Sequence, residues 1–170
     1  MKKILTVGAM TFALITSTSA AIVDKSSVDF SVGTFVFDNT TSGASVGMDV
    51  KGEKNIFIDG LFLGVGINAE MFDPKDVRNK SDDLGLVADV YPTLSYEITN
   101  DISVNTMYGY TIGQVGSETF DGTSYGVGVD YKLSNEFMMG LNYKSSDLEF
   151  TSNKVSIDAD RYNLSFSFKF

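Results

Sequence analysis

The stretch LGLVADVYPTLSYEI, residues 84–98, shows most clearly how the chain folds, because two kinds of residue alternate along its whole length. One set is apolar or aromatic with a single proline: Leu84, Leu86, Ala88, Val90, Pro92, Leu94, Tyr96 and Ile98. The interleaved set is mostly small or polar: Gly85, Val87, Asp89, Tyr91, Thr93, Ser95 and Glu97. A period of two is the side-chain period of a β-strand, so this segment is predicted to be a strand with two unlike faces.

The same alternation recurs along the chain and predicts eight strands. They lie near residues 28–33, 44–51, 61–69, 84–98, 102–112, 125–133, 137–143 and 161–170, although Phe35 and Phe37 break the phase after the first. Tight polar turns are expected at residues 52–55, 99–101 and 134–136. A short loop is expected at 38–43, and longer loops at 72–83, 113–122 and 145–159.

The apolar face carries no charged residue in any of the eight segments, whereas the other face holds Gly, Ser, Asn, Thr and charged residues. A soluble, lipocalin-like barrel is the alternative, but its core would then contain unpaired charges. A single Lys or Arg on a lipid-facing surface costs about 2–4 kcal/mol at mid-depth, so an uncharged face indicates lipid contact. Backbone groups in lipid need partners, which requires a closed sheet. The expected fold is an all-β, eight-stranded antiparallel up-and-down transmembrane β-barrel over residues 21–170.

Two places depart from regular alternation. Pro92 lies on the apolar face and removes one backbone donor, so we expect a bulge or bend there. Ile56 and Ile58 are out of phase with Leu61 and the residues that follow, which predicts a slip or bulge near Asp59 and Gly60.

The first residues have the order of a secretory signal peptide: Lys2 and Lys3, an apolar run over 4–15, and small residues over 16–21. We expect residues 1–20 to be the signal peptide, with cleavage after Ala20 or Ala21. The net charge of −9 excludes nucleic-acid binding through the overall field. The chain has no cysteine, so neither disulfides nor a lipoprotein anchor is expected.

The last residues of the chain resemble those of a known family. Tyr162, Leu164, Phe166, Phe168 and Phe170 resemble the closing-strand signal of outer-membrane barrels, which implies recognition by the barrel-assembly machinery. GVGVDYKLSNEFMMGLNYK, residues 126–144, and YPTLSYEITNDISVNTMYGYTIG, residues 91–113, are similar to segments of small opacity-type and outer-membrane protein A-like barrel domains. The resemblance implies a barrel in the outer membrane of a Gram-negative bacterium, in contact with its lipid and lipopolysaccharide. We expect a monomer, and the resemblance implies no particular activity.

The charged residues predicted to face inward form two levels and are the candidate site. One level, toward the periplasm, contains Asp29, Asp49, Lys51, Glu97, Asp130, Lys132 and Lys169; the other contains Glu70, Asp89, Lys144 and Arg161. In a ring of eight strands the third faces the seventh and the fourth faces the eighth, which directs Glu70 toward Lys144 and Asp89 toward Arg161. One interpretation is an ionic network that plugs the lumen, since eight strands enclose little more than their own side chains. The other is a narrow charge-gated pore, favoured by six inward glycines: Gly64, Gly66, Gly109, Gly126, Gly128 and Gly140.

Catalysis is not expected, because the chain has no histidine to act as a general base and the spacing of Asp89 and Glu70 does not require a paired-carboxylate mechanism. No cofactor or metal is expected either. The outer loops are acidic: Asp73, Asp76, Asp82, Asp83, Glu118, Asp121, Asp147, Glu149, Asp158 and Asp160. These carboxylates are either solvated or share the divalent cations of lipopolysaccharide, and adhesion would depend on these loops. The sequence therefore predicts a non-enzymatic envelope barrel with a closed lumen; a passive pore for small solutes and a surface adhesion protein are the alternatives.

Overall fold

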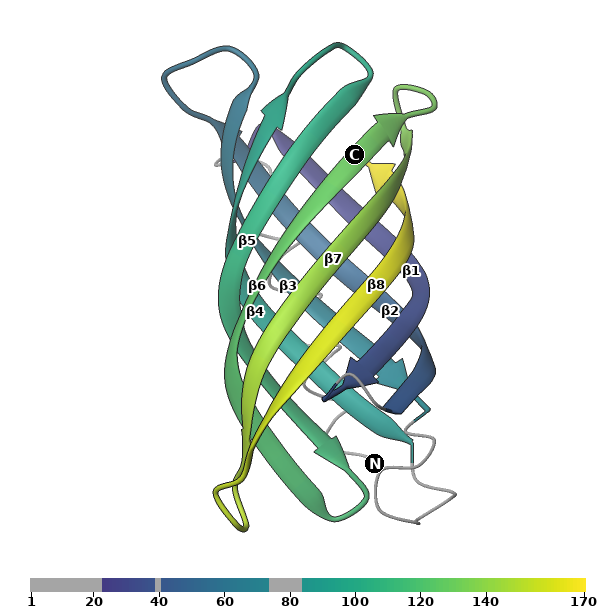
Figure 1. The fold of residues 1–170 in the computed structure, drawn as a ribbon. Helices are drawn as coiled ribbons and strands as arrows, with labels where there is room; N and C mark the ends of the chain where they lie inside the picture. Colours follow the sequence, from purple (N-terminus) through teal and green to yellow (C-terminus); the bar gives the residue numbers. More distant parts are fainter. Residues whose placement is uncertain (1–22, 39–40, 74–83) are drawn as a thin grey trace.

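The computed structural model describes residues 23–38, 41–73 and 84–170, which form one closed barrel (Figure 1). Its strands follow in chain order: β1 (Lys25–Phe37), β2 (Thr41–Asn55), β3 (Leu61–Phe72), β4 (Gly85–Glu97), β5 (Ile102–Val115), β6 (Glu118–Lys132), β7 (Phe137–Phe150) and β8 (Ser156–Lys169). Each strand pairs antiparallel with the next, and β8 closes onto β1. The predicted eight-stranded up-and-down barrel is confirmed.

The two faces of the sheet point in the directions that the alternation predicts. Outward apolar side chains such as Val32, Val65 and Val127 are exposed, while inward polar ones such as Asp89 and Ser165 are buried. A soluble barrel would have the two sets exchanged, so the lipocalin-like alternative is contradicted. No helix in the described ranges is long and apolar enough to cross a bilayer. The predicted signal peptide, residues 1–20, lies outside the described residues and stays a prediction.

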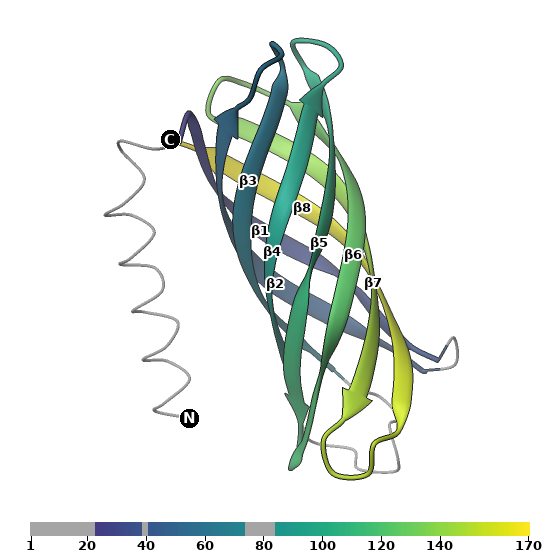
Figure 2. The same ribbon diagram turned by 90° about the vertical axis from the view of Figure 1, so that its left-hand side faces the viewer.

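The barrel has two unlike ends. The turn end carries the start of β1, the end of β8 and the connections at residues 56–60, 98–101 and 133–136. The loop end carries the ends of β1, β3, β5 and β7, with the described connections at residues 116–117 and 151–155. Figure 2 shows the β5–β6 and β7–β8 hairpins reaching farther at the loop end than the β1–β2 hairpin. The prediction of long loops at 113–122 and 145–159 is therefore wrong, because most of these residues are paired strand.

The reason for this error is an inversion of the two faces near the loop end. In these extensions the inward residues are apolar, among them Phe120, Leu148 and Ile157, and the outward ones are polar, as in a water-exposed sheet. Phe35 and Phe37 belong to the same inner surface, so they end the apolar outward pattern without ending the strand.

The two predicted irregularities have other forms. At Pro92 the β4–β5 ladder lacks two pairs, but Val90 pairs with Tyr110 and Thr93 with Met107 in one unchanged register. No residue is inserted, so the missing proline donor interrupts the pairing without producing a bulge. The predicted turn at 52–55 is instead the end of β2, and Ile56 and Ile58 lie in the turn that follows it. The predicted slip within a strand is therefore wrong.

Candidate functional site

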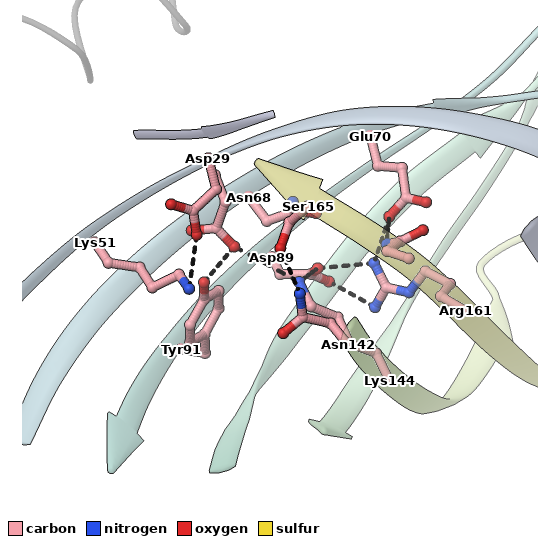
Figure 3. Close-up of polar contacts among 12 residues, drawn as sticks. Asp29, Lys51, Asn68, Glu70, Asp89, Tyr91, Asn142, Lys144, Arg161 and Ser165 are labelled. Carbon is pink, nitrogen blue, oxygen red and sulfur yellow. Dashed lines mark hydrogen bonds and ion pairs between the residues drawn. The ribbon is translucent and has the colours of Figure 1, made fainter. Parts of the chain in front are cut away.

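The centre of the barrel interior is a buried ionic layer formed by Glu70, Asp89, Lys144 and Arg161 (Figure 3). Arg161, from β8, donates two hydrogen bonds to Asp89 of β4: Nη1 to Oδ2 at 2.7 Å and Nη2 to Oδ1 at 3.0 Å. Both side chains are 0% exposed. A bidentate pair of this kind is among the strongest polar contacts in proteins, and here it joins opposite walls of the lumen.

The other two members attach to this pair. Nζ of Lys144 lies 3.3 Å from Oδ2 of Asp89, and Oε2 of Glu70 lies 3.7 Å from Nη1 of Arg161. The expected approach of Glu70 to Lys144 is not among the ion pairs of the described residues; both side chains contact the Arg161–Asp89 pair instead. Lys144 and Arg161 are direct partners in the β7–β8 register, so both cations reach the same carboxylate.

Nearer the turn end lies a second group of polar contacts. Nζ of Lys51 is 2.7 Å from Oδ2 of Asp29, and Lys144 reaches Oδ2 of Asp49 at 3.8 Å. Tyr91 donates a hydrogen bond to Asp49. Asn105 Nδ2 donates to Oδ2 of Asp130 at 2.8 Å.

The register explains why the acids gather on one wall. Asp29 pairs with Asp49, Asp49 with Asn68, and Asn68 with Asp89, so one row of acceptors crosses β1 to β4. The cations Lys144 and Arg161 face this row from β7 and β8. Acids on β1 to β4 therefore face two cations on β7 and β8, and these pairs hold opposite strands together.

Three residues of the predicted network lie at the rim of the turn end. Glu97 pairs there with Lys25, whose Nζ lies 3.3 Å from the centroid of the Phe62 ring. Lys132 and Lys169 make no ion pair within the part of the chain that the structure describes. Sequence reasoning missed Lys25 and Tyr91 as partners, although both share the inward phase of their strands.

The inward glycines do not leave open space. A Cβ placed on Gly66 would lie 2.4 Å from the Tyr91 ring, and one on Gly109 would lie 2.5 Å from Tyr91 Cβ. Gly128 and Gly140 are occupied in the same way, by Asn142 and Asp130. The glycines therefore accommodate large neighbours across the sheet, which removes the observation that favoured a pore.

An apolar cluster fills the loop end of the interior, and sequence reasoning missed it. Its buried members come from six strands: Phe35, Phe37, Phe72, Val87, Phe120, Leu148, Phe150, Ile157 and Ala159. Phe35 stacks on Phe72 with ring centroids 4.1 Å apart, and Phe120 meets Phe150 edge-on at 6.0 Å. The Arg161 guanidinium lies 5.6 Å from the Phe35 ring, so the apolar cluster rests directly on the ionic layer.

The lumen retains small cavities. One of about 30 Å³ is lined by Asp29, Asp49, Lys51, Asn68 and other polar residues, and another of about 30 Å³ lies toward the turn end beside Glu53 and Glu97. At ~10–15 Å³ per molecule, each has room for about two waters. A larger hollow of about 890 Å³ is bordered mostly by outward side chains such as Val127 and Leu141, so we assign it to the lipid-facing surface. In the described ranges no three acidic, histidine or cysteine side chains are grouped as metal ligands would be.

The residues proposed as an assembly signal lie on the seam of the barrel. β8 pairs with β1 on one side and with β7 on the other, and its side chains Tyr162, Phe166 and Phe168 are exposed on the outer face. Phe168 packs edge-on against Phe30 of β1 and Phe137 of β7.

Several solved structures have the same fold. The attachment invasion locus protein Ail of Yersinia pestis matches at a TM-score of 0.58 with 14% identity, over 88% of this chain and 100% of that one. Neisserial surface protein A matches at a TM-score of 0.57 with 11% identity, over 86% of this chain and 96% of that one. The outer membrane enzyme PagL matches at a TM-score of 0.58 with 12% identity, over 82% of this chain and 97% of that one. At these identities the likeness concerns the fold alone.

Comparison of sequences identifies the family. No curated protein is similar enough in sequence to count as a relative. Residues 5–170 match the family described as the outer membrane protein β-barrel domain. The chain therefore belongs to this family of outer-membrane proteins.

Proposed function

We propose that the protein is a non-enzymatic structural component of the outer membrane whose lumen is closed to solutes. The observation that carries this proposal is the stacking of the apolar cluster on the ionic layer. A solute that enters at the loop end meets Phe35 and Phe72, both 1% exposed, and behind them the Arg161–Asp89 pair. The two layers obstruct the lumen by different means, one by packing and the other by charge pairing.

Opening either layer is costly. Separating Arg161 from Asp89 without a replacement leaves buried charges unpaired, which costs about 3–5 kcal/mol. Hydrating the cluster exposes its apolar side chains, at ~1.5–3 kcal/mol for each large one. Both costs exceed thermal energy several-fold, so spontaneous opening is rare.

Two facts support a non-enzymatic role. The chain has no histidine, and the only acids considered for paired-carboxylate chemistry, Asp89 and Glu70, are both buried against Arg161. A substrate has no access to either carboxylate. The likeness to PagL concerns the fold and brings no catalytic residue with it.

Single-channel recording of the purified protein in planar lipid bilayers tests the closure. We expect no steady openings from the native protein and openings from a triple variant that hollows the cluster, Phe35→Ala/Phe72→Ala/Phe120→Ala. The matched control removes three aromatic rings from the outer surface, away from the seam and the assembly signal: Tyr108→Ala/Tyr125→Ala/Tyr131→Ala. This control should stay silent. Steady openings of the native protein would reject the proposal in favour of the pore.

For assembly, the aromatic outer face of β8 supports recognition of Tyr162, Leu164, Phe166, Phe168 and Phe170 by the barrel-assembly machinery. Replacing Phe170 with Ser should lower the amount of folded barrel in the outer membrane while leaving its stability after refolding in detergent unchanged. Undiminished assembly in cells would contradict this role.

A second candidate function, surface interaction, has one specific observation in its favour. The apolar belt is the band of exposed outward apolar side chains that includes Val32, Val65 and Val127. The β5–β6 and β7–β8 hairpins extend beyond this belt as paired strands, and their outward residues include Asp121, Asp147, Glu149, Asp158 and Asp160. A paired hairpin presents these charges at fixed positions, as a recognition surface requires. The attachment invasion locus protein shares this fold.

The structure also determines how to test this candidate. Deleting residues 145–159 would remove Leu148, Phe150 and Ile157 from the apolar cluster and so disturb the barrel itself. Neutralising the outward acids Asp147 and Asp158 with Asn leaves the cluster intact. Cell attachment that is equal in native and neutralised proteins would leave surface interaction through these acids without support.

A further inference from the structure

The turn between β2 and β3 differs from the other turns at its end of the barrel. Its sequence Ile56-Phe57-Ile58 is apolar, whereas the other two contain Thr99-Asn100-Asp101 and Ser134-Asn135-Glu136. Phe57 is 103% exposed and Ile58 is 59% exposed. Phe57 therefore has no packing role within the barrel, and with Ile58 it forms a contiguous exposed apolar tip, the kind of surface that contacts a membrane or a partner.

The backbone of this turn is firmly held. Ile56 N donates to Leu61 O at 2.9 Å, Leu61 N donates to Ile58 O at 3.1 Å, and Asn55 Nδ2 donates to Ile58 O at 3.2 Å. Two further bonds tie the turn to its surroundings: Glu97 N to Gly60 O at 2.8 Å, and Asn55 N to Asp24 Oδ2 at 2.8 Å. The backbone that carries the exposed side chains is thus fixed on the barrel.

Phe57 also occupies an unfavourable conformation. Its φ of +54° lies in the left-handed region, where a bulky residue is strained and Gly or Asn is the usual occupant. A side chain that contributed nothing would be better replaced by either residue. The strain is consistent with a favourable contact of the phenyl ring outside the chain.

The position of the turn identifies the contact. Leu61 pairs with Tyr96 in the β3–β4 register, and the outward side chains next to it, Leu63, Tyr96 and Ile98, are exposed parts of the apolar belt. Figure 1 shows the turn, drawn in blue at the upper left, leaning away from the barrel axis. The apolar tip therefore continues the lipid-facing belt and does not cover the lumen.

We propose that residues 56–58 insert into the lipid leaflet at the turn end and anchor the barrel at that depth. The occupant of this surface is lipid, because the belt that it continues is the lipid-facing surface of an outer-membrane protein. The inference does not depend on whether the lumen conducts.

A unique fluorophore tests the insertion, since the chain contains no tryptophan. Phe57→Trp places one in the apolar turn, and Asn135→Trp places one in a polar turn at the same end as the matched control. In phosphatidylcholine vesicles, Phe57→Trp should emit at a shorter wavelength than the control and be quenched by acyl-chain-brominated phosphatidylcholine. Emission like that of the control, without quenching, would overturn the proposal. A short-wavelength emission that brominated lipid does not quench would also overturn it, because it would mark burial against protein.

A second variant changes the urea concentration of unfolding in opposite directions, depending on whether the Phe57 ring is inert or inserted in lipid. Asn tolerates the left-handed region, so Phe57→Asn relieves the strain. If the ring is inert, this variant unfolds in vesicles at an equal or higher urea concentration than the native protein. If the ring is inserted in lipid, the urea midpoint of Phe57→Asn is lower than that of the native protein, whereas Phe57→Trp keeps the native midpoint. An unchanged or raised midpoint for Phe57→Asn would refute the anchor.

Discussion

Replacing Arg161 with Met tests the ionic layer most directly. Arg161 holds Asp89 with two hydrogen bonds of 2.7 and 3.0 Å, and it is also the nearest cation to Glu70, at 3.7 Å. Met retains a long apolar stem but has no charge. Asp89 then keeps Lys144 at 3.3 Å and Thr111 at 2.6 Å, whereas Glu70 keeps only a long hydrogen bond from Asn163 at 3.4 Å.

The size of the effect follows from burial. Asp89 and Glu70 are both 0% exposed, so water does not replace the lost cation. Breaking a buried pair by removing one partner costs about 3–5 kcal/mol. Because Lys144 still compensates part of the charge of Asp89, we expect about 3 kcal/mol, close to the lower end of that range. This corresponds to a roughly 100-fold change in the unfolding equilibrium constant.

The assay is urea unfolding of the purified barrel in phospholipid vesicles, with the folded fraction read from electrophoretic mobility. A double-mutant cycle with Asp89→Asn isolates the pair, because the second change removes the carboxylate that the first leaves uncompensated. The double variant should therefore lose less than the sum of the two single variants. The control is Lys154→Met, which removes a pair with Glu149 whose side chains are 72% and 46% exposed and should not change the midpoint.

Two results would refute this reasoning. One is a cost for Arg161→Met no larger than the ~1 kcal/mol of a surface ion pair. The other is additive behaviour in the cycle, which would mean that Arg161 and Asp89 do not stabilise the barrel through each other.

Three further predictions use the same unfolding assay. Phe35→Ala hollows the apolar cluster and should cost about 3–5 kcal/mol, while Val32→Ala on the outer face of the same strand leaves no internal cavity and should cost clearly less. Gly66→Ala places a methyl group 2.4 Å from the Tyr91 ring and should cost about 1–3 kcal/mol, a loss that a Tyr91→Ala background relieves. Val127→Lys puts a charge on the exposed apolar face and should cost about 2–4 kcal/mol in vesicles; a neutral result would contradict lipid contact at that position.

The fold could be predicted from the sequence because a barrel strand repeats one simple rule at every second residue. In 84–98 the alternation runs without interruption from Leu84 to Ile98, and the structure keeps this phase in β4, despite the missing pairs at Pro92. The positions of the charged residues on the inner face follow from the same rule. Their approximate level follows from their distance along the strand.

The contacts between opposite walls were less predictable. Counting strands brings β4 opposite β8, and Asp89 does meet Arg161 there. The same counting brings Glu70 toward Lys144, but both contact the Arg161–Asp89 pair instead. The difference arises because the stagger of the strands around the barrel decides which levels meet, and strand number alone does not determine that stagger.

The apolar cluster escaped sequence reasoning because the two faces exchange character near the loop end. Polar outward residues such as Asp121 and Asp147 there resemble loop sequence when each segment is considered alone. One feature of the sequence does indicate the cluster. Apolar residues continue at every second position but in the opposite phase, as in Phe35 and Phe37 or Leu148 and Phe150.

The contact between the two layers implies that they stabilise each other. The apolar cluster keeps water from the Arg161–Asp89 pair, and a charge pair is stronger where water is excluded. In return, Arg161 lies 5.6 Å from the Phe35 ring and supports the base of the cluster. Because residues in contact couple, the losses of unfolding free energy from Phe35→Ala and Arg161→Met should not add. Once the cluster is hollowed, water reaches the ionic layer, and the Arg161 cation stabilises the barrel less. Closure of the lumen therefore depends on both layers together, and opening one layer weakens the other.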